Sequence, residues 1–143
     1  MRTVAVAAFL MLVSATVQAQ TIFECGASDG HTYYFEGGYV SADKAGWHRD
    51  GMSDGQFSLI MRGEKLDVLF RDATGSLVSA EADGAQIFPL HIGDASATIL
   101  LIYPGNVAEV YQFDGPTKTY SLSSIKFGDA PIRKAGTLVG ACR

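Results

Sequence analysis

Short apolar segments alternate with turn-forming residues along most of this chain. Asp-Gly, Gly-Asp and Pro-Gly pairs recur about every ten residues, and the segments between them are rich in β-branched and aromatic side chains. Strands of roughly five to eight residues between such turns leave no room for helices. The pattern predicts an all-β, antiparallel domain with strands near residues 21–25, 31–36, 56–62, 65–71, 76–81, 85–91, 97–103, 107–113, 117–125 and 137–142.

The segment 56–71 predicts a hairpin whose register follows from its own side chains. If Gly63-Glu64 is a two-residue turn, one face carries only apolar pairs, and a shift by one residue would oppose apolar to polar positions. We expect this face to be buried, and it consists of Phe57 with Phe70, Leu59 with Val68 and Met61 with Leu66. We expect the other face to meet water, and it consists of Ser58 with Leu69, Ile60 with Asp67 and Arg62 with Lys65.

The segment that follows residue 106 places a carboxylate among apolar side chains. Alternation puts Val107, Glu109, Tyr111 and Phe113 on one face of the predicted strand. Glu109 is therefore the carboxylate that we expect to point inward. The alternative is that a local twist or bulge carries it to the surface, since burial of a lone carboxylate is costly.

Residues 1–19 have the pattern of a secretory signal peptide. A basic start at Arg2 precedes an apolar run from Val4 to Val13 and the small-residue cleavage pattern Val17-Gln18-Ala19. Cleavage after Ala19 would leave residues 20–143 as a single β-rich domain. The apolar run is too short to span a membrane, and Gln20 stands where a lipoprotein has its lipidated cysteine. We therefore expect a periplasmic or secreted protein without a lipid anchor.

The two cysteines, Cys25 and Cys142, lie near the two ends of this domain. An even pair in an oxidising compartment predicts a disulfide between the first and last strands. A meander that closes into a small barrel would bring these strands side by side and remove exposed edges. A two-sheet β-sandwich could also bring the ends together, so both architectures remain open.

Charge and motif content argue against several classes of function. The formal net charge is −4 and the basic residues are scattered, which argues against nucleic acid as a partner. The three histidines, at positions 31, 48 and 91, have no metal-ligand spacing, and we expect no metal or cofactor. The sequence also lacks a G-x-S-x-G or S-x-x-K motif and a phosphate-binding glycine loop, so we do not expect an enzyme.

The longest segment without a strand pattern, Gly37 to Gly55, contains the only tryptophan. Long loops in compact domains often carry recognition residues, and this one combines an aromatic ring, a titratable ring and both charges. The alternative is that Trp47 folds back to plug one end of the barrel. The candidate binding residues come from this segment, from the predicted strand 31–36 and from the predicted strand 107–113. They are Trp47, His48, Arg49, Asp50, Tyr34, Glu109 and Tyr111.

Several short motifs resemble those of small exported bacterial proteins that have no assigned activity. These motifs are Cys25-Gly26, Tyr33-Tyr34, Gly46-Trp47, Asp50-Gly51-x-Ser53-x-Gly55, Glu109-Val110-Tyr111 and the terminal Cys142. The resemblance covers most of the chain after the leader and implies a periplasmic β-rich domain without implying an activity. Barrel inhibitors of C-type lysozyme share the early and late cysteines, but their inhibitory loops have no clear counterpart here.

Two hypotheses on function follow. The first is a non-catalytic binding module that holds a small apolar or aromatic ligand in a barrel mouth or on the Trp47 loop. The second is a periplasmic protein-interaction or inhibitor protein, similar in role to lysozyme inhibitors, whose acidic surface suits a basic envelope enzyme. The sequence specifies neither the ligand, nor the partner, nor the oligomeric state.

Overall fold

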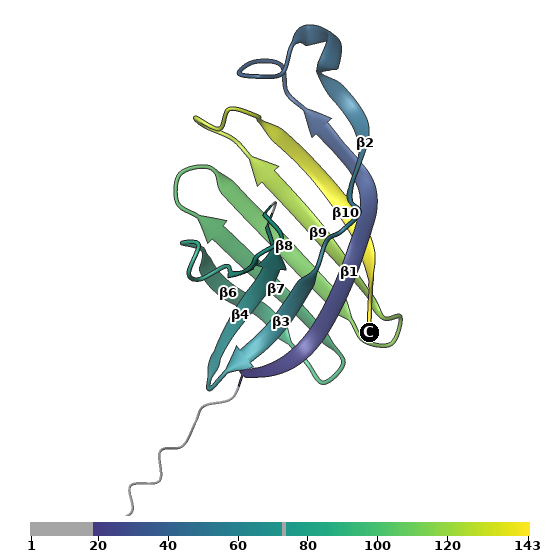
Figure 1. Cartoon of the computed structure of the whole chain (residues 1–143), viewed down its shortest axis with the longest axis vertical. Coiled ribbons are helices and arrows are strands. Elements are labelled where there is room, and N and C mark those ends of the chain that lie inside the picture. The colour runs from purple at the N-terminus through teal and green to yellow at the C-terminus, as the bar shows by residue number, and fades with distance from the viewer. Residues whose placement is uncertain (1–18, 73) are drawn as a thin grey trace, which may run out of the picture.

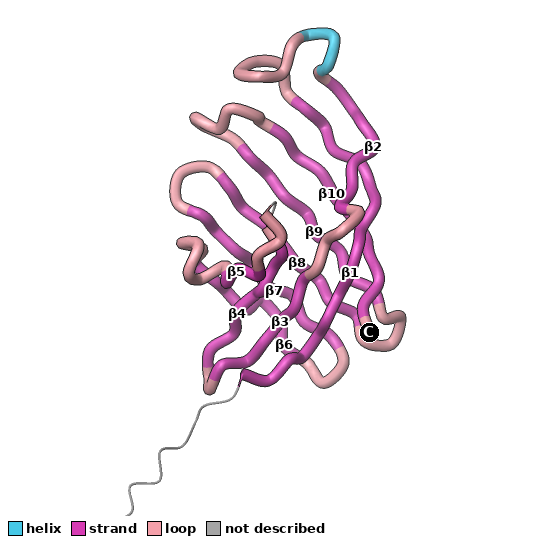
Figure 2. Tube along the Cα trace, viewed as in Figure 1, coloured by secondary structure: helices cyan, strands magenta, loops and turns pink. Residues whose placement is uncertain are grey.

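The computed structural model describes residues 19–72 and 74–143, and the predicted leader up to residue 18 lies outside them. Their strands form one antiparallel sheet with the order β5-β4-β3-β1-β10-β9-β8-β7-β6, and β2 pairs with β1 in addition. The 3-10 turn η1 (Ala42–Lys44) lies between β1 and β2 (Figure 2). The strands are β1 (Ala19–Tyr34), β2 (Gly46–Met52), β3 (Phe57–Arg62), β4 (Lys65–Arg71), β5 (Leu77–Ser79), β6 (Gln86–Ile92), β7 (Ser96–Tyr103), β8 (Val107–Asp114), β9 (Thr119–Lys126) and β10 (Lys134–Cys142).

The sheet curls into a half-barrel, as Figure 1 shows. The all-β antiparallel prediction is confirmed, and one continuous sheet corresponds to the predicted barrel rather than to the two-sheet sandwich. The first strand lies beside the last, because β1 pairs with β10 over most of the length of β10. In the part of the chain that the structure describes, no helix is long and apolar enough to cross a membrane.

The long strand β1 replaces two shorter strands that the sequence predicts. Its first part, up to Cys25, pairs with β3, and its second part, from Ser28, pairs with β2 on the same edge. The predicted turn at Asp29-Gly30 is wrong, because the strand runs straight through it. A Cβ at Gly30 would lie 2.1 Å from the carbonyl oxygen of Thr137, so the glycine permits a close approach of β10 and does not make a turn.

The register predicted for the β3–β4 hairpin is confirmed at every pair. The ladder opposes Phe57 to Phe70, Leu59 to Val68 and Met61 to Leu66. The face that carries these residues turns into the half-barrel, and Leu59 and Val68 are fully buried there. The alternation of apolar side chains thus specifies which way the hairpin packs.

The opposite face of this hairpin is more buried than the sequence predicts. Ser58 and Ile60 are buried, and Asp67 is only 1 % exposed. The carboxylate of Asp67 accepts hydrogen bonds from Ser79 Oγ at 2.6 Å and from the backbone N–H of Glu81 at 3.3 Å. The expectation that this whole face meets water is therefore wrong, because β5 and the segment that follows it bond to Asp67.

The predicted disulfide is present. Cys25 and Cys142 are register partners of β1 and β10, and their sulfurs are bonded across a sequence separation of 117 residues. The bond lies where β1 changes partner from β3 to β2, and Cys25 belongs to the core. The largest side chains of that core that are fully buried are Tyr120, Phe113, Leu59, Ile99 and Leu101.

Candidate functional site

Part of the predicted recognition loop is a strand. The segment from Gly46 to Met52 forms β2 and pairs with β1, so the prediction of an irregular segment from residue 37 to 55 is wrong for these residues. Mixed polarity conceals the strand in the sequence, because neither of its faces is consistently apolar. In a strand, alternate side chains point to opposite faces. Trp47 and Arg49 therefore lie on one face, and His48 and Asp50 lie on the other.

Trp47 does not plug the barrel. Its side chain is 69 % exposed, and its ring packs edge-on against Tyr33 at 5.5 Å between centroids. Trp47 and Tyr33 share the convex face of the sheet with a shallow groove of about 560 Å³, whose lining includes Ala108, Val110 and Ile125. We call Trp47 with this lining the convex groove. Arg49 lies on the same face and forms an ion pair with Asp29, whose pKa it lowers chiefly through a hydrogen bond.

The concave face holds two more of the predicted residues, Tyr34 and Asp50, in a bonded cluster. The Tyr34 hydroxyl donates to Asp50 Oδ2 at 2.9 Å, and Lys134 Nζ lies 3.3 Å from the same oxygen. Burial acts to raise the pKa of Asp50, but the Tyr34 hydroxyl and the Lys134 ammonium outweigh it, so the pKa is lowered. His48 lies on this face too, and its Nε2 bonds to the carbonyl oxygen of Lys44 at 2.9 Å.

Glu109 points inward, as predicted, and it is bonded to Tyr111. The Tyr111 hydroxyl donates to Glu109 Oε2 at 3.1 Å, and the tyrosine is buried in the core. Burial raises the pKa of Glu109, against the opposing effects of the Tyr111 hydrogen bond and of Lys126 and Lys134. The alternative, in which a bulge carries Glu109 to the surface, is wrong because β8 keeps a regular register with both neighbouring strands.

A cavity of about 420 Å³ opens at the end of the half-barrel where β7 turns into β8. Core side chains supply its apolar lining, and charged and polar groups reach it from β4, β7, β8 and β9 and from Asp83 after β5. We call this cavity the mouth, and its main residues are Phe57, Phe70, Leu122, Tyr103, Glu109 and Lys126. It combines apolar side chains with groups of both charges.

Tyr103 and Lys126 are mouth residues that the sequence analysis did not select. Burial raises the pKa of Tyr103, and Glu109 and Asp83 raise it further, so this side of the mouth is electronegative. Lys126 lies opposite Lys134 in the β9–β10 ladder, so the other side is electropositive. Alternation could have found Lys126, because it follows Tyr120 and Leu122 at even spacing on the same face as these core residues.

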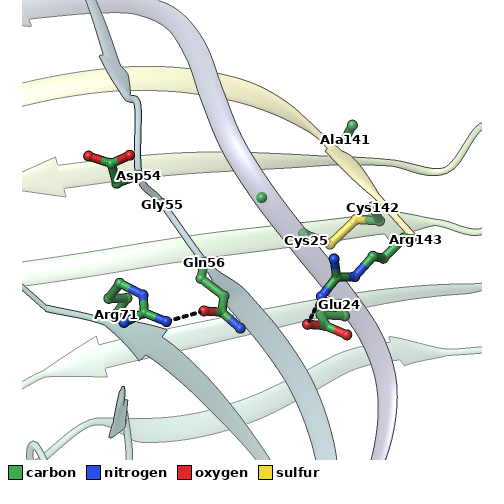
Figure 3. A pocket seen from close by; sticks show the side chains of 10 residues that line it. Glu24, Cys25, Asp54, Gly55, Gln56, Arg71, Ala141, Cys142 and Arg143 are labelled. Carbon is green, nitrogen blue, oxygen red and sulfur yellow. Dashed lines mark hydrogen bonds and ion pairs between the residues drawn. A yellow bond between two sulfur atoms is a disulfide. The ribbon is translucent and has the colours of Figure 1, made fainter. Parts of the chain in front are cut away.

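A second cavity, of about 560 Å³, lies beside the disulfide (Figure 3). Four of its charged and polar side chains bond to one another in two pairs. Arg71 donates to Gln56 Oε1 at 2.7 Å, and Arg143 forms an ion pair with Glu24. Because these groups already satisfy each other, the mouth is the better candidate for a ligand.

No protein-family model, curated protein or solved structure matches this chain. Its function must therefore be inferred from its own geometry. Among residues 19–72 and 74–143, no three histidine, cysteine or carboxylate side chains come close enough together to hold a metal ion.

Replacing Glu109 by Gln should stabilise the protein at neutral pH and have little effect near pH 4. The pKa of Glu109 is higher in the folded state than in the unfolded state. As the pH rises, the unfolded state therefore loses this proton first, and the free energy of unfolding falls until the carboxyl of the folded state also ionises. Gln removes this loss and keeps an oxygen that accepts from Tyr111. Urea unfolding from pH 4 to pH 8 measures the effect, with Glu64→Gln in the exposed β3–β4 turn as the control. Identical pH profiles for Glu109→Gln and wild type would contradict the prediction.

Proposed function

We propose that this protein is an exported, non-catalytic binding module that holds a small apolar or aromatic ligand in the mouth of its half-barrel. The observation that carries the proposal is a cavity of about 420 Å³ that is lined by apolar core side chains and by a few polar and charged groups. Small-molecule sites typically occupy about 300–1,000 Å³ and have this composition. Phe57 and Phe70 supply aromatic surface, while Tyr103, Glu109 and Lys126 can fix a ligand's orientation.

Two features support the exported part of the proposal. Residues 1–19 have the composition of a cleavable leader, and the Cys25–Cys142 disulfide is of a kind that persists in oxidising compartments. Expression of the full chain in a bacterial host, followed by mass analysis of the periplasmic fraction, tests it. A mature protein that begins at Gln20 would support export, and retention of the uncleaved chain in the cytoplasm would contradict it.

The binding experiment uses N-phenyl-1-naphthylamine, a neutral aromatic probe whose fluorescence rises in an apolar site. Met52→Trp introduces a larger side chain at a position that lines the mouth, and it should weaken binding at least tenfold. Trp47→Ala, on the convex face, is the matched control and should leave binding unchanged. Binding that survives Met52→Trp but is lost with Trp47→Ala would place the ligand elsewhere and contradict the proposal.

A second candidate function is a periplasmic protein-interaction or inhibitor protein that acts on a basic envelope enzyme. The observation that favours it is the exposed Trp47 beside Tyr33 at the convex groove, since aromatic side chains of this kind anchor many interfaces. A chain of net charge −4 also suits a basic partner such as a C-type lysozyme.

This second function is tested by assaying lysozyme with wild type and with Trp47→Ala. Inhibition that Trp47→Ala weakens at least tenfold would support it. Absence of inhibition at micromolar concentrations of the wild-type protein would remove lysozyme as the partner.

A further inference from the structure

Two side chains of opposite charge line the mouth from neighbouring strands. In the β8–β9 ladder Glu109 lies opposite Ser124, and Lys126 lies opposite Val107. Glu109 and Lys126 are thus diagonal neighbours on the concave face, at a Cα separation of roughly 7–8 Å. Both contribute to the lining of the same cavity.

These two side chains do not form an ion pair with each other. Lys126 forms no ion pair with any residue of the described chain, although Lys134 beside it is paired with Asp50. Glu109 receives a hydrogen bond from Tyr111 at Oε2, and no described residue donates to its Oε1. In the described chain, Ser28 Oγ is the only fully buried side-chain polar atom without a partner, so Glu109 Oε1 is not completely buried. A carboxylate oxygen and an ammonium group therefore both remain available to a ligand.

Two further charged side chains lie near Glu109 and Lys126. Asp83 adds a second carboxylate to the cavity lining and acts on Tyr103, which lies near Glu109. Lys134 lies beside Lys126 on β10, and its ammonium is paired with Asp50. The mouth thus holds carboxylates that favour a cationic group next to the Lys126 ammonium, which favours an anionic group. Arg71 also lines the cavity, but it donates to Gly75 O and to Gln56 Oε1.

We propose that the ligand is a small zwitterion with an apolar body, namely an α-amino acid with an aromatic side chain. Its ammonium group donates to Glu109, its carboxylate accepts from Lys126, and its ring packs against Phe57 and Phe70. This assignment rests on the proposed binding function and specifies the head group of the ligand. A ligand with one charge would leave either Glu109 or Lys126 without a partner inside the mouth, which is unfavourable.

Three probes that share one aromatic body test the head group. L-phenylalanine carries both charges, 3-phenylpropionate carries only the negative charge, and 2-phenylethylamine carries only the positive charge. Isothermal titration calorimetry should give L-phenylalanine at least tenfold tighter binding than either of the others.

Matched variants assign each charge to its residue. Glu109→Gln should weaken the binding of L-phenylalanine and 2-phenylethylamine at least tenfold and should leave the binding of 3-phenylpropionate unchanged. Lys126→Gln should weaken the binding of L-phenylalanine and 3-phenylpropionate and should leave the binding of 2-phenylethylamine unchanged. Lys44→Gln, at an exposed lysine in η1, is the control for loss of a positive charge and should change nothing.

The outcomes separate this inference from the proposed function. Equal binding of the three probes, or tighter binding of one of the singly charged probes, would overturn the zwitterion assignment and leave the mouth as a binding site. Binding of N-phenyl-1-naphthylamine without binding of any of the three would overturn it too. Failure of all four probes to bind would overturn the proposed function itself.

Discussion

Loss of the Cys25–Cys142 disulfide should lower the free energy of unfolding by about 4 kcal/mol. The bond joins residues 117 positions apart, and closing so long a loop removes much of the conformational entropy of the unfolded chain. The chain-entropy model gives roughly 4–5 kcal/mol for a loop of this size. Urea unfolding of the oxidised protein and of the Cys25→Ala, Cys142→Ala double variant measures the difference.

Treatment with a reductant provides the control for this experiment. The reductant should destabilise wild type to about the level of the double variant and should have no effect on the double variant itself. Equal stability of oxidised wild type and double variant would show that the crosslink contributes nothing.

Replacing Leu59 by Ala should cost roughly 2–5 kcal/mol of stability. Leu59 is fully buried in the half-barrel, and the smaller side chain would leave a cavity that its neighbours fill only in part. Leu90→Ala is the matched control, because Leu90 on β6 is 58 % exposed and the same substitution should cost less than about 1 kcal/mol. Thermal or urea unfolding of the three proteins checks both values.

The comparison also tests the direction in which the β3–β4 hairpin packs. Leu59 stands opposite Val68 on the face that the register predicts to be buried. Similar losses at Leu59 and Leu90 would mean that this face is not the core.

The sequence predicts elements whose stability is local. The β3–β4 hairpin is an example, because its turn and its apolar pairs lie within 15 residues of each other and favour a single register. The inward position of Glu109 follows in the same way from its alternation with Val107 and Tyr111. In these segments the near neighbours along the chain decide the structure.

Prediction from the sequence is wrong where pairing with a distant strand decides the local structure. Asp29-Gly30 has the composition of a turn, but pairing with β10 and β2 on its two sides holds it extended. Likewise, β2 has no consistently apolar face, and it forms because residues 28–34 of β1 offer it a free edge. Both effects depend on residues far away in the chain.

The candidate site was only partly predictable for the same reason. Glu109 and Tyr111 could be selected from one strand, and both lie on the concave face. The contribution of Tyr103 and Lys126 depends on how β7, β8 and β9 curl around one cavity, which no single segment reveals. The sequence predicts one loop that contains Trp47, His48, Arg49 and Asp50, and the strand β2 separates Trp47 and Arg49 from His48 and Asp50 onto opposite faces.

The pairing of β1 with β10 has a consequence for the order of events during synthesis. A ribosome makes β1 before the other strands and β10 after them, so one edge of β1 has no partner until β10 has been made. Contacts this distant in sequence form slowly. The half-barrel therefore cannot close at this seam until residues 134–142 have been made, and a growing chain that stops before residue 134 lacks the strand that covers β1.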